Sequence, residues 1–270
     1  MKRVDMACYR ELVPYITKDP CGTVYPLSIA EMKQYGDVFT DGDSFLLWHF
    51  SGFAFIIGAC GEDFLEQIYR DLLTADSLTR SFVLFTADER AERYFREKSE
   101  LSFGRRYSFE YKGDTGALPA EVRHGYDVCE LGEELFDTVE GRVTPRFSWR
   151  TSEEFLRNGK GICVLHGERA AAWAFSAAVS DFEMDIGVEA LPEYRHMGLA
   201  FLAAEQMIRC CSEQGKRPVC NRLKIDCNDQ ECFLLNSFIL PLLTTNKQCS
   251  FIWFFLKSHI IYIKFKHFTI

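Results

Sequence analysis

Acidic residues are absent from the last 38 positions of this 270-residue chain, although the chain as a whole carries a net charge of −8. Residues 233–270 contain four lysines, so the first 232 residues hold 27 basic and 39 acidic residues, a balance of −12. An acidic surface disfavours nucleic-acid binding, which depends on neutralising phosphates, and it attracts cationic small molecules such as amines. We therefore expect a small-molecule partner and no nucleic-acid partner.

Long apolar runs are also missing. Residues 1–15 include Asp5 and Glu11 and lack the apolar core of a signal peptide. The longest uncharged run near the carboxy terminus, residues 232–246, has 15 positions and includes Pro241, whereas a transmembrane helix needs about 20 apolar residues. These absences predict a cytoplasmic protein with no membrane partner.

Cysteine pairs with the Cys-x-x-Cys spacing are absent, although the chain has 11 cysteines. The odd count, the adjacent Cys210 and Cys211, and the lack of an export signal favour free buried thiols over a disulfide framework. Zinc is the alternative, through Cys220, Cys227 and Cys232, but their spacing matches no zinc motif. We therefore expect no metal site.

The first half of the chain alternates strand and helix patterns, and no internal sequence repeat is visible. Apolar runs and helical stripes predict, in order, strand, helix, strand, helix and strand over residues 44–57, 63–73, 81–86, 88–98 and 106–111. This order indicates a small α/β layer. Glycines and Pro119 within residues 113–125 mark the expected boundary between an amino-terminal domain, 1–128, and a second domain, 129–270.

The second half begins with a capping-box pattern at Ser152, which predicts a short helix over residues 152–156. Three strands are then predicted, over residues 162–165, 170–179 and 182–188. A long helix follows over residues 198–214, and Gly215 ends it.

The turn before this long helix has the pattern Arg-x-x-Gly-x-Ala. It reads Arg195-His196-Met197-Gly198-Leu199-Ala200. Glycine and alanine leave the backbone uncovered where the helix begins, so several N–H groups point outward without a partner. Such donors at the positive end of a helix dipole suit a pyrophosphate, and Arg195 can add a charge-assisted hydrogen bond. The alternative interpretation is a helix start with small residues for packing.

The stretch IGVEALPEYRHMGLAFLAAEQMI, residues 186–208, resembles the acetyl-coenzyme A motif of the GCN5-related N-acetyltransferase (GNAT) superfamily. Together with FSWRTSEEFLRNGKGICVLHGERAAAWAFS, residues 147–176, it is similar to the group that includes the zwittermicin A resistance acetyltransferases. The resemblance covers about residues 147–226. It implies an α/β fold with a mixed sheet flanked by helices, a GNAT-type carboxy-terminal domain after a smaller α/β domain, and acetyl-CoA as co-substrate.

The resemblance also implies which residues bind the cofactor. They are Val188, Arg195, His196, Met197, Gly198, Leu199, Ala200 and Asn228. In the family, the strand before the loop parts from its neighbour at a bulge and offers an N–H to the thioester carbonyl. In this sequence that bulge is expected near residues 187–189.

The implied reaction is direct transfer of an acetyl group to a small amine in a ternary complex. The amine must lose a proton, because a free amine has a pKa near 10. Glu183 and Asp185 share one face of the strand and are the expected catalytic bases, with Glu189 as a third candidate. Alternatively, these carboxylates lie on a strand face that is exposed to solvent and have no catalytic role.

The resemblance ends after Asn228. The family's closing Leu-Gly-Phe element and its tyrosine general acid have no counterpart, and no glycine follows Gly215. We therefore expect an atypical tail from about residue 233 that packs poorly, although residues 260–265 could pair as a strand. The functional alternative is a catalytically impaired acyl-CoA-binding protein with an altered carboxy terminus. A nucleotide-binding oxidoreductase ranks last, because no Gly-x-Gly-x-x-Gly fingerprint follows a first strand.

Overall fold

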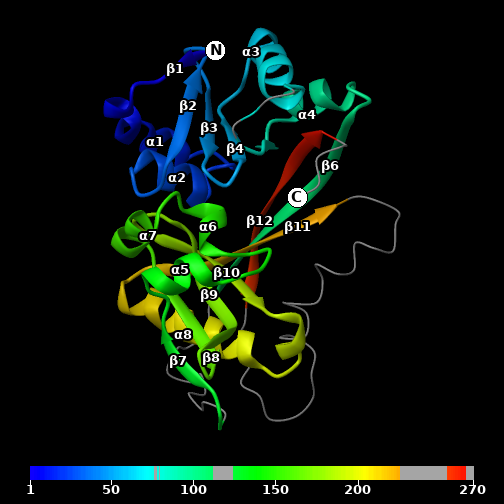
Figure 1. Ribbon diagram of the computed structural model, residues 1–270. Helices are drawn as coiled ribbons and strands as arrows, with labels where there is room; N and C mark the ends of the chain where they lie inside the picture. Colours follow the sequence, from blue (N-terminus) through cyan, green and yellow to red (C-terminus); the bar gives the residue numbers. More distant parts are fainter. Residues whose placement is uncertain (76–77, 79, 112–123, 226–253, 266–270) are drawn as a thin grey trace. The chain divides into compact units, whose positions relative to one another are not determined.

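The computed structural model describes residues 1–75, 78, 80–111, 124–225 and 254–265 (Figure 1). These residues form two compact units, which are described separately. The first unit contains residues 1–107, 222–225 and 258–265, and the second contains residues 108–221 and 254–257. The domain division at residues 128 and 129 stays a prediction. Within the described residues, the helices are all too short or too polar to cross a membrane.

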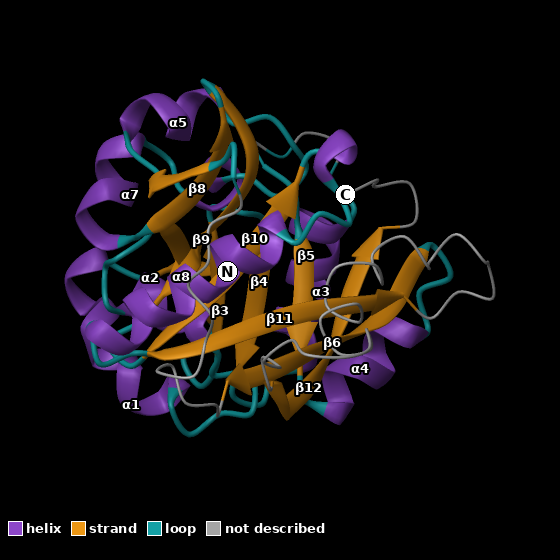
Figure 2. Ribbon diagram, turned by 90° about the horizontal axis from the view of Figure 1, so that it is seen from below, coloured by secondary structure: helices purple, strands orange, loops and turns teal. Residues whose placement is uncertain are grey.

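The first unit is a mixed sheet with helices packed on it. Its elements are β1 (Lys2–Arg3), a 3-10 helix (Met6–Leu12), α1 (Val13–Ile16), α2 (Val24–Ala30), β2 (Gly36–Thr40), β3 (Phe45–His49), β4 (Phe53–Ile57), α3 (Glu62–Ile68), β5 (Val83–Thr86) and α4 (Glu89–Arg96). Strands β1 to β4 are antiparallel neighbours, and β4 pairs with β5 in parallel. Figure 2 labels β3, β4 and β5 of this sheet. Strand β6 (Leu101–Tyr111) begins in this unit.

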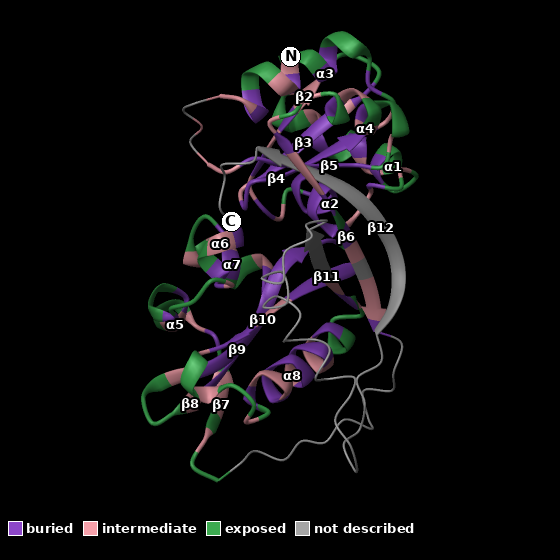
Figure 3. Ribbon diagram, turned by 90° about the vertical axis from the view of Figure 1, so that its right-hand side faces the viewer, coloured by how far each residue is buried: buried purple, intermediate pink, exposed green. Residues whose placement is uncertain are grey.

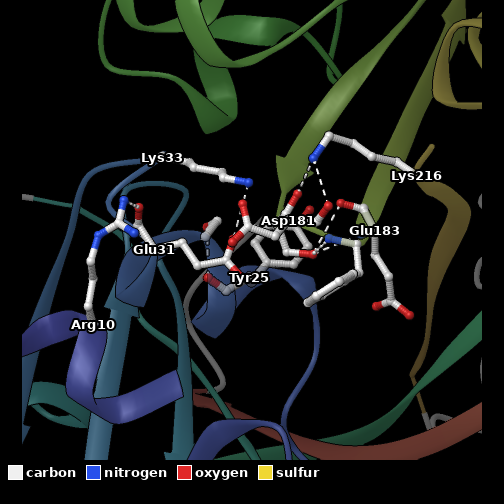
Figure 4. Close-up of polar contacts among 10 residues, drawn as sticks. Arg10, Tyr25, Glu31, Lys33, Asp181, Glu183 and Lys216 are labelled. Carbon is white, nitrogen blue, oxygen red and sulfur yellow. Dashed lines mark hydrogen bonds and ion pairs between the residues drawn. The ribbon is translucent and has the colours of Figure 1, made fainter. Parts of the chain in front are cut away.

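The apolar residues of β4 and β5 form the centre of the first unit. All five residues of β4 are buried, as expected for a strand covered on both faces. Phe55 lies opposite Phe85 in the parallel ladder, and their rings stack with centroids 4.8 Å apart. At one end of α2, Glu31 lies 3.3 Å from Lys33 Nζ, and Arg10 donates a hydrogen bond to the Glu31 carbonyl (Figure 4).

The second unit has its own mixed sheet. Its elements are β7 (Asp127–Glu130), α5 (Glu133–Thr138), α6 (Pro145–Ser148), α7 (Ser152–Asn158), β8 (Gly161–His166), β9 (Arg169–Val179), β10 (Glu183–Ala190), a 3-10 helix (Pro192–Tyr194), α8 (Leu199–Glu213) and the first part of β11 (Arg217–Ile225), whose residues 222–225 belong to the first unit. Strands β7, β8, β9 and β10 are antiparallel neighbours, and β10 pairs with β11 in parallel.

Helices cover the two faces of this second sheet, whose strands β9 and β10 are largely buried (Figure 3). On one face, Cys211 Sγ of α8 lies 3.3 Å from Met184 Sδ of β10. On the other face, Trp173 Nε1 donates a hydrogen bond to the carbonyl of Val143, in the connector between α5 and α6. Because side chains alternate along a strand, Glu183, Asp185 and Glu189 lie on the face opposite α8.

The elements predicted over residues 81–111 and 152–214 are present, with ends that shift by a few residues. The single strand predicted over residues 44–57 is instead two antiparallel strands, β3 and β4, because the chain turns between them at Gly52, which has φ = 89°. The predicted helix over residues 63–73 is shorter than expected, because α3 ends at Ile68 and the chain continues as a π-helical turn to Leu73. The sequence patterns did not predict the amino-terminal helices or β2. The predicted α/β class with mixed sheets is confirmed.

The carboxy-terminal tail supplies one described strand. Strand β12 (Phe254–Phe265) pairs with β5 in antiparallel orientation, with Ile261 opposite Thr86. The predicted strand over residues 260–265 is therefore present. Residues 226–253 and 266–270 lie outside the described residues, so the predicted poor packing of the tail stays a prediction.

The two units repeat one topology, although their sequences show no repeat. In each unit three antiparallel strands lead into a helix and then into a strand parallel to the third. In the first unit this series is β2, β3, β4, α3 and β5, and in the second it is β8, β9, β10, α8 and β11. Equivalent positions in the two units can therefore be compared directly.

Candidate active site

The turn between β10 and α8 contains two residues with left-handed backbone conformation. His196 has φ = 62° and Gly198 has φ = 79°. Arg195, which lies between the 3-10 helix and His196, has an extended backbone. Left-handed residues next to a helix start gather successive N–H groups into a concave set of donors. A positive φ is uncommon for a residue other than glycine, but histidine is among the residues that tolerate it.

The start of α8 has no side-chain cap among the described residues. By contrast, Thr151 Oγ1 accepts a hydrogen bond from the Glu154 N–H at the start of α7, and Asp88 caps α4 in the same way. The first intrahelical bond of α8 runs from the Leu202 N–H to the Gly198 carbonyl. The N–H groups of residues 199–201 therefore have no hydrogen-bond acceptor among the described residues and can meet an anion, at the positive end of a helix of 15 residues.

The predicted cofactor residues surround this helix start, with differing exposure. Arg195, His196 and Gly198 are exposed, whereas Leu199 is buried and anchors the helix to the core. Met197 and Ala200 are half-buried. Arg195 Nε lies 3.5 Å from the Ala190 carbonyl, at the limit of a hydrogen bond. Asn228 lies outside the described residues.

Among the described residues, strands β10 and β11 are paired only over the first part of β10. Their parallel pairing covers Glu183–Asp185, whereas β10 stays paired with β9 as far as Ala190. The Leu191 N–H donates to the Ala171 carbonyl of β9, so odd-numbered residues of β10 direct their main-chain groups toward β9. Even-numbered residues, including Ile186 and Val188, therefore direct theirs toward the side from which β11 has departed.

The strand irregularity lies two residues earlier than predicted. The β9–β10 register shifts between Asp185 and Ile186, which leaves Ala177 of β9 as the extra residue, whereas the sequence predicted a bulge of β10 near residues 187–189. The reason is that the extra residue belongs to the partner strand, whose sequence carries no signal for it. The N–H of Val188 still faces the parted side of β10.

The three candidate carboxylates of β10 are all buried, with 5%, 4% and 8% of the surface exposed at Glu183, Asp185 and Glu189. Glu183 Oε1 accepts a hydrogen bond from Arg217 Nη2 at 2.9 Å. Burying a carboxylate is costly unless it is paired, so Arg217 compensates Glu183. The interpretation of this row as a solvated strand face is therefore wrong.

Glu189 holds the connector between α5 and α6. Its Oε2 accepts a hydrogen bond from the Val143 N–H at 2.6 Å, and Trp173 Nε1 donates to the Val143 carbonyl at 2.8 Å. A Cβ atom at Gly141 would collide with the Glu189 carboxylate, so the connector approaches the strand closely at that glycine. Sequence reasoning missed Val143, because an apolar residue in a connector carries no signal for this role.

A lysine fixes the turn between β9 and β10. Lys216 Nζ donates hydrogen bonds to the carbonyls of Ser180 at 2.5 Å and Asp181 at 3.1 Å (Figure 4). The Arg217 N–H that follows donates to the Phe182 carbonyl, the first contact of the parallel ladder. These contacts connect the segment that follows α8 to the start of β10, next to Glu183.

Comparisons with known sequences match most of the chain. A family model described as GNAT acetyltransferase matches residues 25–228, including much of the first half, in which the sequence showed no motif. The uncharacterized N-acetyltransferase YdfB of Bacillus subtilis (strain 168) is 25% identical over 204 residues, which are 71% of this chain and 77% of YdfB.

Comparisons with solved structures agree on the fold. A GCN5-related N-acetyltransferase-like protein from Streptococcus suis 89/1591 is similar with a TM-score of 0.67 and 19% identity, over 97% of this chain and all of that protein. A tandem GNAT protein from the clavulanic acid biosynthesis pathway has a TM-score of 0.54 and 10% identity, over 99% of this chain and 98% of that protein. With a family match over more than half of its length, this chain belongs to the GNAT acetyltransferase family.

Proposed function

We propose that this protein is an acetyl-CoA-dependent N-acetyltransferase that acts on a small amine by direct transfer in a ternary complex. One observation carries the proposal: the uncapped start of α8 follows a strand that has parted from its parallel neighbour. This arrangement offers main-chain donors both for a pyrophosphate and for a thioester carbonyl. We further propose a cytoplasmic enzyme of the group similar to the zwittermicin A resistance acetyltransferases.

The residues around the α8 start fit the cofactor chemically. Arg195 is exposed and cationic, and the turn to Ala200 presents N–H groups beside it. We assign Arg195, His196, Met197, Gly198, Leu199 and Ala200 to the pyrophosphate, and His196 is a loop side chain rather than a base. Acetyl-CoA supplies an activated acyl group as a thioester. The N–H of Val188, on the parted side of β10, is our candidate donor to its carbonyl, and Asn228 remains a predicted contact.

Carboxylates near this donor are suited to the acceptor amine. A buried acidic row favours entry of an ammonium ion, and a carboxylate can then take its proton directly or through a water molecule. The neutral nitrogen attacks the thioester carbon, the C–S bond breaks, and the sulfur leaves as a thiolate that takes up the proton that the attacking nitrogen loses as the amide forms. We assign the base to Glu183 or Asp185. Arg217 compensates the charge of Glu183, and Glu189 is committed to the Val143 N–H.

The proposal is tested by titrating the full chain with acetyl-CoA in a calorimeter and by measuring free thiol release with a panel of small amines. Binding together with amine-dependent release supports the enzyme. Binding without release from any amine supports the catalytically impaired acyl-CoA-binding protein instead. A full chain that does not bind acetyl-CoA contradicts both functions.

A further inference from the structure

Four side chains tie the turn before α8 to neighbouring strands, and we call them the loop clamp: Tyr126, His166, Tyr194 and Met197. His166 Nδ1 and the Tyr194 hydroxyl are 3.2 Å apart, and the two rings meet edge to face at 5.7 Å. The Tyr126 ring lies 5.1 Å from the His166 ring, and its hydroxyl is 3.8 Å from Met197 Sδ.

The loop clamp brackets the strained part of the turn. Tyr194 precedes the left-handed His196 by two residues, and Met197 follows it directly. Backbone conformations of this kind persist only where surrounding contacts fix them. The partners come from distant parts of the chain, since His166 lies in the β8–β9 hairpin and Tyr126 directly precedes β7.

A second contact links the same hairpin to the turn but contributes little. Arg169 Nη2 lies 2.7 Å from Glu193 Oε1, with 61% and 47% of these side chains exposed. Exposed ion pairs are screened by solvent and usually add only a small stabilisation. The hydroxyl–imidazole contact of Tyr194 and His166 is also exposed, but ring contacts among Tyr194, His166 and Tyr126 support it, so it is the better-defined connection.

We propose that the loop clamp holds the turn in its anion-binding form before the cofactor arrives, so that His166 and Tyr194 are positioning residues for coenzyme A. This inference rests on the proposed function. A turn that is already ordered does not lose conformational freedom on binding, which raises affinity without a direct contact to the ligand. His166, an exposed residue of the β8–β9 hairpin, thereby acquires a role.

The test uses the full-length His166→Ala and Tyr194→Phe variants and the double variant, with Glu168→Ala as the matched control in the same exposed hairpin turn. Two quantities are measured: the dissociation constant for coenzyme A by calorimetry, and amide hydrogen exchange of residues 193–199 in the free protein. We expect affinity to weaken about 3- to 10-fold, the scale of one lost hydrogen bond, and exchange in the turn to accelerate. The melting temperature should stay that of the wild type.

The double variant sharpens the test, because residues that act through one shared contact give non-additive losses. A double variant no weaker than His166→Ala supports the clamp. Wild-type exchange in the turn, or faster exchange with unchanged affinity for coenzyme A, overturns it. If the wild type itself fails to bind coenzyme A, the proposed function fails and this cofactor role fails with it, while the exchange data still show whether the hairpin orders the turn.

Discussion

The starts of α3 and α8 occupy equivalent places in the two units, but their surroundings differ in charge. The first turn of α3 contains Glu62 and Asp63, whereas the first turn of α8 has no acidic residue. The Gly61 N–H at the start of α3 donates to the Asp41 carboxylate, which also accepts hydrogen bonds from Ser44. A protein carboxylate thus takes the place at α3 that we assign to a phosphate at α8.

The strands that precede these helices differ as well. In the parallel ladders, Glu183 and Asp185 of β10 occupy the positions that Phe53 and Phe55 occupy in β4. The two phenylalanines pack in the aromatic core of the first unit, where both contact the ring of Tyr25. One topology therefore supports an aromatic strand core in one unit and a strand with a row of buried carboxylates in the other. Function on a shared fold depends on the residues at the site.

The largest effect is expected from a matched pair of substitutions at the two helix starts. Gly198→Asp places a side chain at a positive φ and a negative charge among the N–H donors, so acetyl-CoA affinity should fall about 100-fold or more. Gly61→Asp is the control, because that position has an ordinary φ, and a Cβ there would lie no closer than 4.0 Å to its nearest neighbour, Asp41 Oδ2. Calorimetric titration measures both. Unchanged affinity in Gly198→Asp would contradict the assigned site.

A large effect on turnover is expected when the carboxylates of β10 are removed. Asp185→Asn together with Glu183→Gln should lower turnover about 10²- to 10⁴-fold, as loss of a general base does, with little change in acetyl-CoA affinity. Initial rates of thiol release under saturating acetyl-CoA provide the measurement. The exposed Glu168→Gln is the control. Full activity in the double variant would leave the amine's own acid–base equilibrium as the route.

A moderate loss of stability is expected when the carboxylate at the α3 start is removed. Asp41→Ala leaves the N–H groups of Ser44 and Gly61 without their acceptor and should cost about 1 kcal/mol in the free energy of unfolding, measured in urea. Asp43→Ala is the neighbouring control. A stable Asp41→Ala variant with an unchanged urea midpoint would show that this carboxylate does not stabilise the start of α3.

The same contact predicts a pH dependence. Burial acts to raise the pKa of Asp41, but hydrogen bonds from Ser44, Asp43 and Gly61 outweigh it, so the net shift is downward. The stabilisation is therefore fully present above the unfolded pKa, about 3.9, and is lost as the pH falls through the lower folded value. The stability difference between wild type and Asp41→Ala should shrink in that acidic window. Because Asp41 is exposed, we expect a small change.

The smallest effect is expected at the left-handed turns. The first unit places glycine at its corresponding turn, where Gly58 has φ = 87°, whereas the second unit places His196 at φ = 62°. His196→Gly should therefore match or slightly raise the melting temperature, while His196→Val should lower it by the equivalent of about 1 kcal/mol, since a β-branched residue resists this conformation. Equal melting temperatures for the glycine and valine variants would mean that the turn relaxes.

Local patterns in the sequence were sufficient for much of the second unit. Alternating residues predicted β10, Gly198 and the small residues after it predicted the start of α8, and the Ser152 pattern predicted α7. These signals depend on residues that are close together in the sequence, so a single sequence is enough to detect them. The first unit was harder to interpret, because its helix start lacks the pattern Arg-x-x-Gly-x-Ala and its β4 carries no polar residue.

The sequence by itself therefore determined the α/β class, the phosphate-loop candidate and the acidic row of β10. Only the tertiary structure decided which groups meet: Glu183 with Arg217, Glu189 with the Val143 N–H, and Tyr194 with His166. Each of these contacts joins residues 28 to 46 positions apart, through strand register and hairpin placement. Register depends on the packing of whole strands, and a shift of one residue would move every side chain to the other face.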